Sequence, residues 1–183
     1  MKPNFNQMNS VEIASFICQQ LHDIDVKTTL SGGFCAEIYS FGEYTSMDID
    51  LIDQSLFKNI EIIKKMLELG FTKVGKHFAH PDMKYTVEFP SSPLAIGSEL
   101  VHEISEIETE YGVLRIITPT DCVKDRLAGF YFWNDDRSLE QALLVAIKNK
   151  IDMMNIQKWS INEGEKEKFQ IFNHDYNIRM KDK

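Results

Sequence analysis

Hydrophobic residues recur at helical spacing in two segments of the first half of the chain. A helix is predicted from about residue 10 to 22, because Asn9 and Glu12 resemble a capping box and apolar residues follow three and four positions apart. A second helix is predicted to begin at Ser55, a residue type that caps helices, and to end at Gly70. The apolar residues expected along it are Leu56, Ile60, Ile63 and Leu67.

Short apolar runs bounded by turn residues predict a set of strands. The expected strands are residues 26–30, 47–52, 71–78, 83–89, 100–104 and two within 107–117. The first runs into Ser31-Gly32-Gly33, a glycine turn on which a short helix over 34–39 is expected to begin. Residues 79–82 and Tyr111-Gly112 favour hairpin turns, and the prolines after the fourth strand favour a loop over 90–98.

The pattern becomes helical after residue 117. Thr118-Pro119 is typical of a helix start, because the threonine can cap the helix and proline suits its first position. Helical spacing returns over 139–151, and Ser160–Glu163 repeats the capping-box signature before a final helix with Phe169 and Phe172. The chain is therefore expected to end in a bundle of helices.

Strands mixed with few helices indicate an α+β fold rather than a regularly alternating α/β fold. We expect a mixed β-sheet flanked by helices over residues 1–117 and a C-terminal helical region over 118–183 packed on it. With 183 residues, of which 43% are hydrophobic, the chain can bury a substantial core.

Charge and cysteine content narrow the class of protein. A net charge of −8 argues against a broad electrostatic grip on nucleic acid. The three cysteines, Cys18, Cys35 and Cys122, are widely spaced, which favours reduced thiols over a disulfide framework or a zinc knuckle. The sequence shows no hydrophobic leader and no membrane-spanning stretch, so a cytoplasmic protein is expected.

The strand over 47–52 carries the most informative chemistry. Side chains alternate along a strand, so Asp48 and Asp50 share one face, about 7 Å apart, while Ile49 and Leu51 share the other. Such a carboxylate pair is suited to holding divalent cations, and oxygen ligands with no histidine nearby favour Mg²⁺ or Mn²⁺ over zinc. Backbone N–H groups at the preceding glycine turn could approach a phosphate.

A third carboxylate is expected from the strand over 83–89. Alternation places Lys84, Thr86 and Glu88 on the face opposite the apolar residues. If this strand neighbours that of the acid pair, Glu88 completes a cage for metal ions and Lys84 meets the charge of a triphosphate.

These residues resemble the nucleotidyltransferase superfamily of the DNA polymerase β type. Its pattern is a hydrophobic residue and a glycine turn, two acids separated by one apolar residue, and a third acid on a later strand. Leu30 with Gly32-Gly33 matches the turn, Asp48-Ile49-Asp50 matches the acid pair, and Glu88 matches the third acid. Within the superfamily the chain looks most like bacterial minimal and AbiEii-type nucleotidyltransferases.

The resemblance implies metal-dependent transfer of a nucleoside monophosphate from a nucleoside triphosphate, such as ATP, to a hydroxyl group. Asp48, Asp50 and Glu88 would bind Mg²⁺ or Mn²⁺ and carry the catalysis. The residues expected to contact the nucleotide are Gly32, Gly33, Ser46, Lys84, and Arg126 or Lys124. The acceptor is open between a small molecule such as an aminoglycoside, an RNA end and a protein side chain. The alternative is an inactive module of the same fold, acting as a binding protein or toxin–antitoxin component.

Other chemistry-bearing residues have plainer interpretations. His77 and His80 are expected to be ordinary surface histidines, since a strand would turn them to opposite faces. Cys35 lacks a partner base and is expected to be a buried thiol. Tyr131 and Trp133 stay candidates for a surface that contacts a partner protein.

Overall fold

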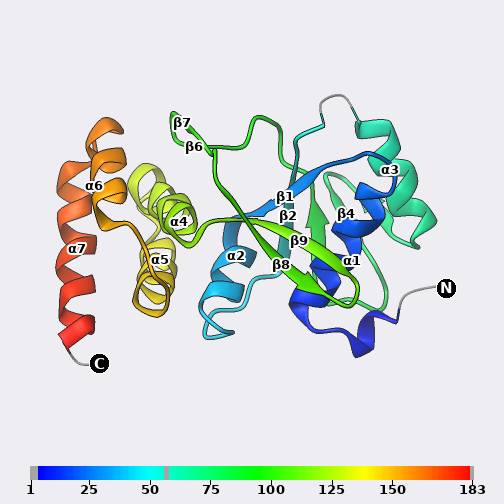
Figure 1. Cartoon of the computed structure of the whole chain (residues 1–183), viewed down its shortest axis with the longest axis horizontal. Coiled ribbons are helices and arrows are strands. Elements are labelled where there is room, and N and C mark those ends of the chain that lie inside the picture. Colours follow the sequence, from blue (N-terminus) through cyan, green and yellow to red (C-terminus); the bar gives the residue numbers. More distant parts are fainter. Residues whose placement is uncertain (1–3, 56–57, 182–183) are drawn as a thin grey trace.

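The computed structural model describes residues 4–55 and 58–181 (Figure 1). Its helices are η1 (Phe5–Gln7), α1 (Ser10–His22), α2 (Gly32–Tyr39), α3 (Asn59–Glu68), α4 (Pro119–Trp133), α5 (Asp136–Lys148), α6 (Met153–Asn162) and α7 (Lys166–Lys181). Its strands are β1 (Thr28–Ser31), β2 (Asp48–Asp53), β3 (Thr72–Val74), β4 (His77–Ala79), β5 (Thr86–Glu88), β6 (Ala95–Ile96), β7 (Glu99–Leu100), β8 (Ile104–Thr109) and β9 (Gly112–Ile117). None of the helices in the described part is long and apolar enough to cross a membrane.

Seven of the strands form one mixed sheet in the order β3-β4-β5-β2-β1-β9-β8. The central strand, β2, pairs in parallel with β5 and antiparallel with β1, and β1 pairs in parallel with β9. The outer pairs β3–β4 and β8–β9 are antiparallel. Helix α1 packs against β1, β8 and β9. Because β2 lies between β1 and β5, Ser31, Asp50 and Glu88 lie side by side at the centre of the sheet.

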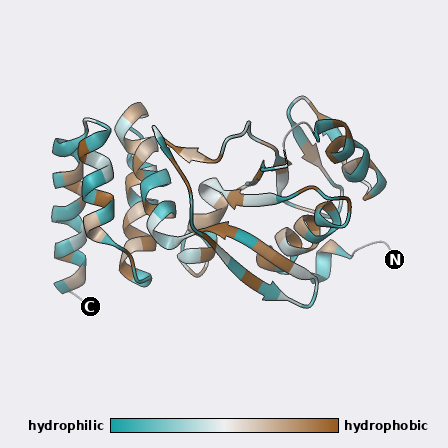
Figure 2. Ribbon diagram, turned by 45° about the horizontal axis from the view of Figure 1, so that its top comes forward, coloured by the Kyte–Doolittle hydropathy of each residue, from teal (hydrophilic) through white to brown (hydrophobic). Residues whose placement is uncertain are grey.

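A continuous core joins the sheet to its helices. Alternate residues of the central strands are fully buried, among them Leu30, Ile49, Leu51 and Val87. Figure 2 shows hydrophobic residues along the strands and on the inner sides of the helices, whereas α7 at the far left is largely hydrophilic. Burial of such apolar surface is the main favourable contribution to folding.

The C-terminal helices α4 to α7 lie together at one end of the molecule (Figure 1). Helix α4 begins as expected: Thr118 accepts a hydrogen bond from the Asp121 N–H, and proline occupies the first turn. Helix α2 packs against both α4 and α5. The Trp159 indole N–H of α6 donates to the Ile96 carbonyl at 3.1 Å, which ties the β6–β7 hairpin to the bundle. Residues of α4 are therefore held close to the start of α2.

The predicted class is confirmed: a mixed sheet flanked by helices is followed by a helical region. The capping box at Asn9 and Glu12 is present in α1, and Phe169 and Phe172 are buried in α7. The division into two parts at residue 117 stays a prediction.

The predicted start and buried face of α3 are wrong. The helix begins at Asn59, and its fully buried residues are Ile62 and Met66. Ile60 and Leu67 are instead 79% and 53% exposed. The predicted apolar face of the helix is therefore rotated from the observed one, because the assumed start at Ser55 turned the wrong apolar residues inward. The predicted Leu56 lies outside the described residues.

Three further elements differ from the sequence prediction. The capping box predicted at Ser160 is wrong, because this residue lies inside α6, where its hydroxyl donates to the Ile156 carbonyl. The segment 71–78 is two strands that meet at Gly75, which has a positive φ of 61°. The segment 90–98, predicted as a loop, contains β6.

Candidate functional site

The three predicted acids lie on two adjacent strands at the centre of the sheet. Asp50 of β2 is directly opposite Glu88 of β5, and Asp48 is opposite Thr86. Ile49, between the two aspartates, is fully buried, so the carboxylates share the half-buried face, as alternation requires. Oxygens of Asp48 and Glu88 lie within 4.8 Å of one another. The structure therefore brings ligand atoms of Asp48 and Glu88 together, and places Asp50 opposite Glu88 but outside the group whose ligand atoms lie within 4.8 Å.

Asp50 is the carboxylate most affected by its surroundings. Burial, with the neighbouring negative charge of Glu88, raises the pKa of Asp50 to about 6. The Arg126 guanidinium acts in the opposite direction. Crowding of two carboxylates in a partly buried site disfavours the ionised form, which a bound cation would reverse.

The glycine turn lies directly against Asp50. Gly32 has φ +74°, and a Cβ atom there would come 2.2 Å from Oδ2 of Asp50. Glycine is therefore required both by the backbone conformation and by the closeness of the carboxylate. Ser31, which precedes the turn as N-cap of α2, makes no side-chain capping bond. The first-turn N–H groups of α2 thus face this site without a capping side chain from Ser31.

Two more predicted residues lie at Gly33. A Cβ atom on Gly33 would be 3.3 Å from Oγ of Ser46 and 3.6 Å from a terminal nitrogen of Arg126. Arg126 reaches this position from α4, where Asp125 and Gln141 accept hydrogen bonds from it. The glycine turn, Ser46 and Arg126 therefore line one small space beside the acids.

Lys124 and Lys84 lie elsewhere. The Lys124 ammonium is buried between Glu99 and Asp121, at 2.7 and 3.2 Å. Lys84 precedes β5, and its exposed ammonium lies 4.7 Å from the centre of the Tyr85 ring. The Lys84 ammonium contacts Tyr85 instead of the acids, although burial alternates from Lys84 to Glu88 as predicted.

A buried glutamate supports the segment that precedes the acid pair. Glu37 of α2 is 7% exposed, and its carboxylate accepts hydrogen bonds from the Ser46 N–H at 2.8 Å and from the Tyr85 hydroxyl at 3.1 Å. It thereby links the glycine-turn helix to Ser46 and to the strand of Glu88. Sequence reasoning missed Glu37, although a lone acid in the apolar run Phe34–Tyr39 was a usable signal.

His77 is the second residue that sequence reasoning missed. It lies on β4 directly opposite Glu88, with Nδ1 2.7 Å from Oε1 of that glutamate. Lys76 contacts the other oxygen at 3.1 Å. Ligand atoms of Asp48, His77 and Glu88 all lie within 4.8 Å of one another. The expectation of an ordinary surface histidine, and of no histidine near the acids, is wrong because β4 begins at His77, after the turn at Gly75, and pairs with β5 so that His77 lies opposite Glu88.

His80 also departs from the expectation of a surface residue. Its ring packs edge-on against Phe5 and Phe71, with centroid distances of 4.8 and 5.2 Å. Its surroundings are aromatic, and it lies outside the group formed by His77 and the acids.

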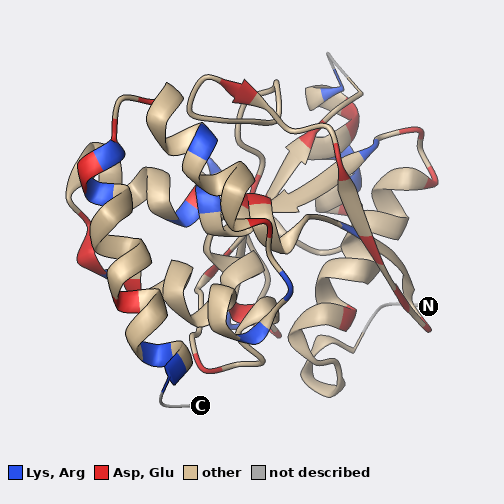
Figure 3. Cartoon of the chain, turned by 60° about the vertical axis from the view of Figure 1, so that its left-hand side comes forward, with Lys and Arg blue, Asp and Glu red and all other residues tan. Residues whose placement is uncertain are grey.

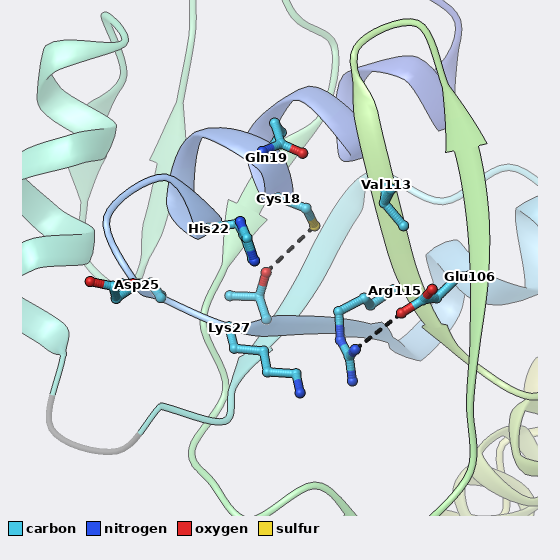
Figure 4. Close-up of a pocket in the computed structure, with 10 residues that line it drawn as sticks. Cys18, Gln19, His22, Asp25, Lys27, Glu106, Val113 and Arg115 are labelled. Atoms are coloured by element: carbon cyan, nitrogen blue, oxygen red, sulfur yellow. Dashed lines mark hydrogen bonds and ion pairs between the residues drawn. The ribbon is translucent and has the colours of Figure 1, made fainter.

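A separate cavity of about 470 Å³ opens at the other end of β1 (Figure 4). In it the Thr28 hydroxyl donates to the Cys18 sulfur, and Arg115 pairs with Glu106 at 3.2 Å. None of the three acids lines this cavity. It is therefore distinct from the cluster around Asp50.

The remaining predicted features are mostly structural. Cys18, Cys35 and Cys122 are free and buried. Tyr131, proposed for a partner surface, is instead buried and stacked on Trp159, whereas Trp133 is 75% exposed. Figure 3 shows acidic and basic positions interspersed along the helices in that view.

Comparison with known proteins gives little beyond this geometry. No protein-family model and no curated protein matches the chain. Among solved structures, that of the antibiotic-resistance factor ANT(2'')-Ia is similar, with a TM-score of 0.42 and 14% sequence identity over 92% of this chain and 91% of that one. Likeness at this level does not say what the present chain binds or transforms. The resemblance to AbiEii-type enzymes stays a prediction.

Proposed function

We propose that this protein is a metal-dependent nucleotidyltransferase that moves a nucleoside monophosphate from a nucleoside triphosphate to a hydroxyl acceptor. The observation that carries the proposal is the convergence of Asp48, Asp50 and Glu88 on adjacent strands, beside a glycine turn that a carboxylate and an arginine both approach. Carboxylates are arranged in this way where phosphate-bound cations have to be held.

The donor set fits a divalent cation. Asp48 and Glu88 place oxygens within 4.8 Å of one another, and Asp50 lies opposite Glu88 on the neighbouring strand. Asp48, Asp50 and Glu88 would hold Mg²⁺ or Mn²⁺. When bound, such an ion neutralises phosphate charge and polarises the phosphoryl group that is transferred.

The glycine turn and Arg126 would hold the triphosphate. First-turn N–H groups of α2 donate to phosphate oxygens, and absence of a side chain at residues 32 and 33 lets the phosphates approach the backbone. The guanidinium of Arg126 has five N–H donors, which suits it to phosphate as well as to Asp125 and Gln141. Ser46, held by Glu37, lines the same space.

In the reaction, the acceptor oxygen forms a bond to the α-phosphorus. The bond from that phosphorus to the bridging oxygen of the β-phosphate breaks, and pyrophosphate leaves with the electron pair. The hydroxyl proton passes to the carboxylate of Glu88, which acts as the general base.

The nature of the acceptor follows only in part from the chain. A net charge of −8 disfavours a long RNA and leaves a small hydroxyl compound, an RNA end or a protein side chain. A role as a toxin–antitoxin component would be compatible with any of these acceptors.

Label transfer tests the proposal. The full chain is incubated with each of the four nucleoside triphosphates, radiolabelled at the α-phosphate, with Mg²⁺ or Mn²⁺ and with fractionated cell extract. We expect label to enter one acceptor fraction, and Asp48→Asn and Glu88→Gln to abolish the transfer. Asp82→Asn, which makes the same charge change in the exposed turn before β5, should retain it. Label transfer that survives in Asp48→Asn and Glu88→Gln, or that occurs with none of the triphosphates, would refute the proposal.

A further inference from the structure

The acids continue into a row that crosses three strands. Asp50 on β2 is opposite Glu88 on β5, and Glu88 is opposite His77 on β4. Residues opposite one another in a sheet point to the same face, with Cβ atoms about 5 Å apart. The imidazole thus belongs to the same half-buried face as the carboxylates and comes from a strand that the acid motif does not include.

The imidazole nitrogen in this row lies against a carboxylate oxygen without a well-directed hydrogen bond. Nδ1 of His77 is shut off from solvent and makes no hydrogen bond with any group in the described part of the chain. It nevertheless lies 2.7 Å from Oε1 of Glu88, a separation at which a correctly directed N–H would donate. A buried nitrogen that faces a carboxylate oxygen this closely without a well-directed hydrogen bond is unusual in folded proteins.

We propose that Nδ1 of His77 is a ligand of the cation held by Asp48 and Glu88, and that this nitrogen makes the site prefer Mn²⁺ to Mg²⁺. This inference rests on the proposed function, which requires a bound cation. It adds which residue supplies a further ligand and which metal ion is preferred. A nitrogen and an oxygen that bind one ion are close neighbours, as Nδ1 and Oε1 are. Mg²⁺ binds oxygen ligands almost alone. Of the two ions considered, Mn²⁺ is the transition metal and accepts an imidazole nitrogen more readily, so one nitrogen ligand changes the preference between them.

The competing explanation is that His77 only positions Glu88. Together with Lys76, which lies 3.1 Å from the other oxygen of Glu88, it would then hold the carboxylate by charge. That role predicts equal effects of a His77 substitution on every divalent cation, and no bond from the metal to nitrogen. The two explanations therefore differ in measurements that need no enzymatic activity.

The test uses the full chain without an affinity tag, and Mn²⁺ or Mg²⁺ alone as the probe. Electron spin-echo spectroscopy of the Mn²⁺ complex should show modulation from a directly bound imidazole nitrogen, which His77→Ala should remove. Calorimetry should show that His77→Ala and His77→Gln weaken Mn²⁺ binding by about tenfold or more, and Mg²⁺ binding by less than about threefold. His102→Ala, which changes an exposed histidine outside the cluster, should alter neither measurement.

Wild-type protein that binds Mn²⁺ without nitrogen modulation would overturn the assignment of His77, and so would equal losses for both metals. If Asp48→Asn still abolished Mn²⁺ binding in that case, the proposed function would stand without the histidine. A wild-type chain that binds neither metal would overturn both. The wild-type spectrum alone shows whether a nitrogen binds the metal. The proposal can therefore be refuted even if a variant fails to fold.

Discussion

Replacing Asp50 by asparagine should make the metal-free protein more stable at neutral pH. The folded protein raises the pKa of Asp50 from 3.8 to about 6, so it binds this proton more tightly than the unfolded chain does. The stability that the proton gives is present below pH 3.8 and is lost as the pH rises toward 6. A shift of about two units corresponds to about 3 kcal/mol at full effect. Asparagine, which has no charge to bury, avoids that loss.

The two proteins should be compared by urea unfolding in the presence of a chelator at pH 4.0 and pH 7.5. Exchange of a carboxyl for an amide adds a constant difference, so the informative quantity is how the stability gain changes with pH. We expect Asp50→Asn to gain about 2 kcal/mol more at pH 7.5 than at pH 4.0. Asp82→Asn, an exposed control, should show no comparable change. A gain that is equal at the two pH values would show that the site does not strain the Asp50 carboxylate.

Metal should reverse the order of stability. A cation that binds the folded wild-type protein at about 100 times its Kd stabilises it by about 2.7 kcal/mol. Asp50→Asn should receive much less of this stabilisation, because it lacks one negatively charged ligand. Equal stabilisation of both proteins by Mn²⁺ would place the bound ion away from Asp50.

Further substitutions test the surroundings of the acids. Gly32→Ala should lower the free energy of unfolding by at least about 1–2 kcal/mol and abolish label transfer, because φ is +74° and the added Cβ meets Asp50. Urea unfolding and the label-transfer assay measure the two effects. Unchanged values in both would contradict the geometry. Arg126→Lys should weaken binding of a metal–nucleotide complex by about tenfold in calorimetry, with little change in melting temperature. Lysine cannot reproduce the planar set of N–H donors of the guanidinium. Unchanged affinity would show that Arg126 does not contact the phosphates. Glu37→Gln should cost about 1–2 kcal/mol in urea unfolding, because an amide replaces the buried carboxylate that accepts from Ser46 and Tyr85; a cost near zero would show that this support is dispensable.

The acid cluster could be predicted because it depends on short-range rules. Alternation along one strand is enough to place Asp48 and Asp50 on the same face, and the same rule separates Glu88 from Val87. The glycine turn could also be predicted, because Gly32 and Gly33 follow an apolar strand. That β5 neighbours β2 was an assumption that no local rule supports, and only the folded sheet could establish it.

The features of the site that could not be predicted from the sequence depend on breaks in strand register and on long-range packing. His77 was assigned to the wrong environment because one apolar run hides the turn at Gly75, and the strand phase changes there. Ser160 carries a correct local capping pattern, yet packing of α6 against α4 buries its hydroxyl beside that of Tyr131. The choice of Arg126 over Lys124 was equally beyond local rules, because both are on α4 and only its packing against α2 decides which one faces the turn.

Calorimetric titration of the full chain with a nucleoside triphosphate analogue that resists cleavage after the α-phosphate tests the central claim most directly. With Mn²⁺ present, we expect binding that weakens by at least about tenfold when the metal is chelated and that Glu88→Gln reduces to the same level. Affinity that is the same with and without metal, or that Glu88→Gln leaves unchanged, would contradict a cation site built from these three carboxylates.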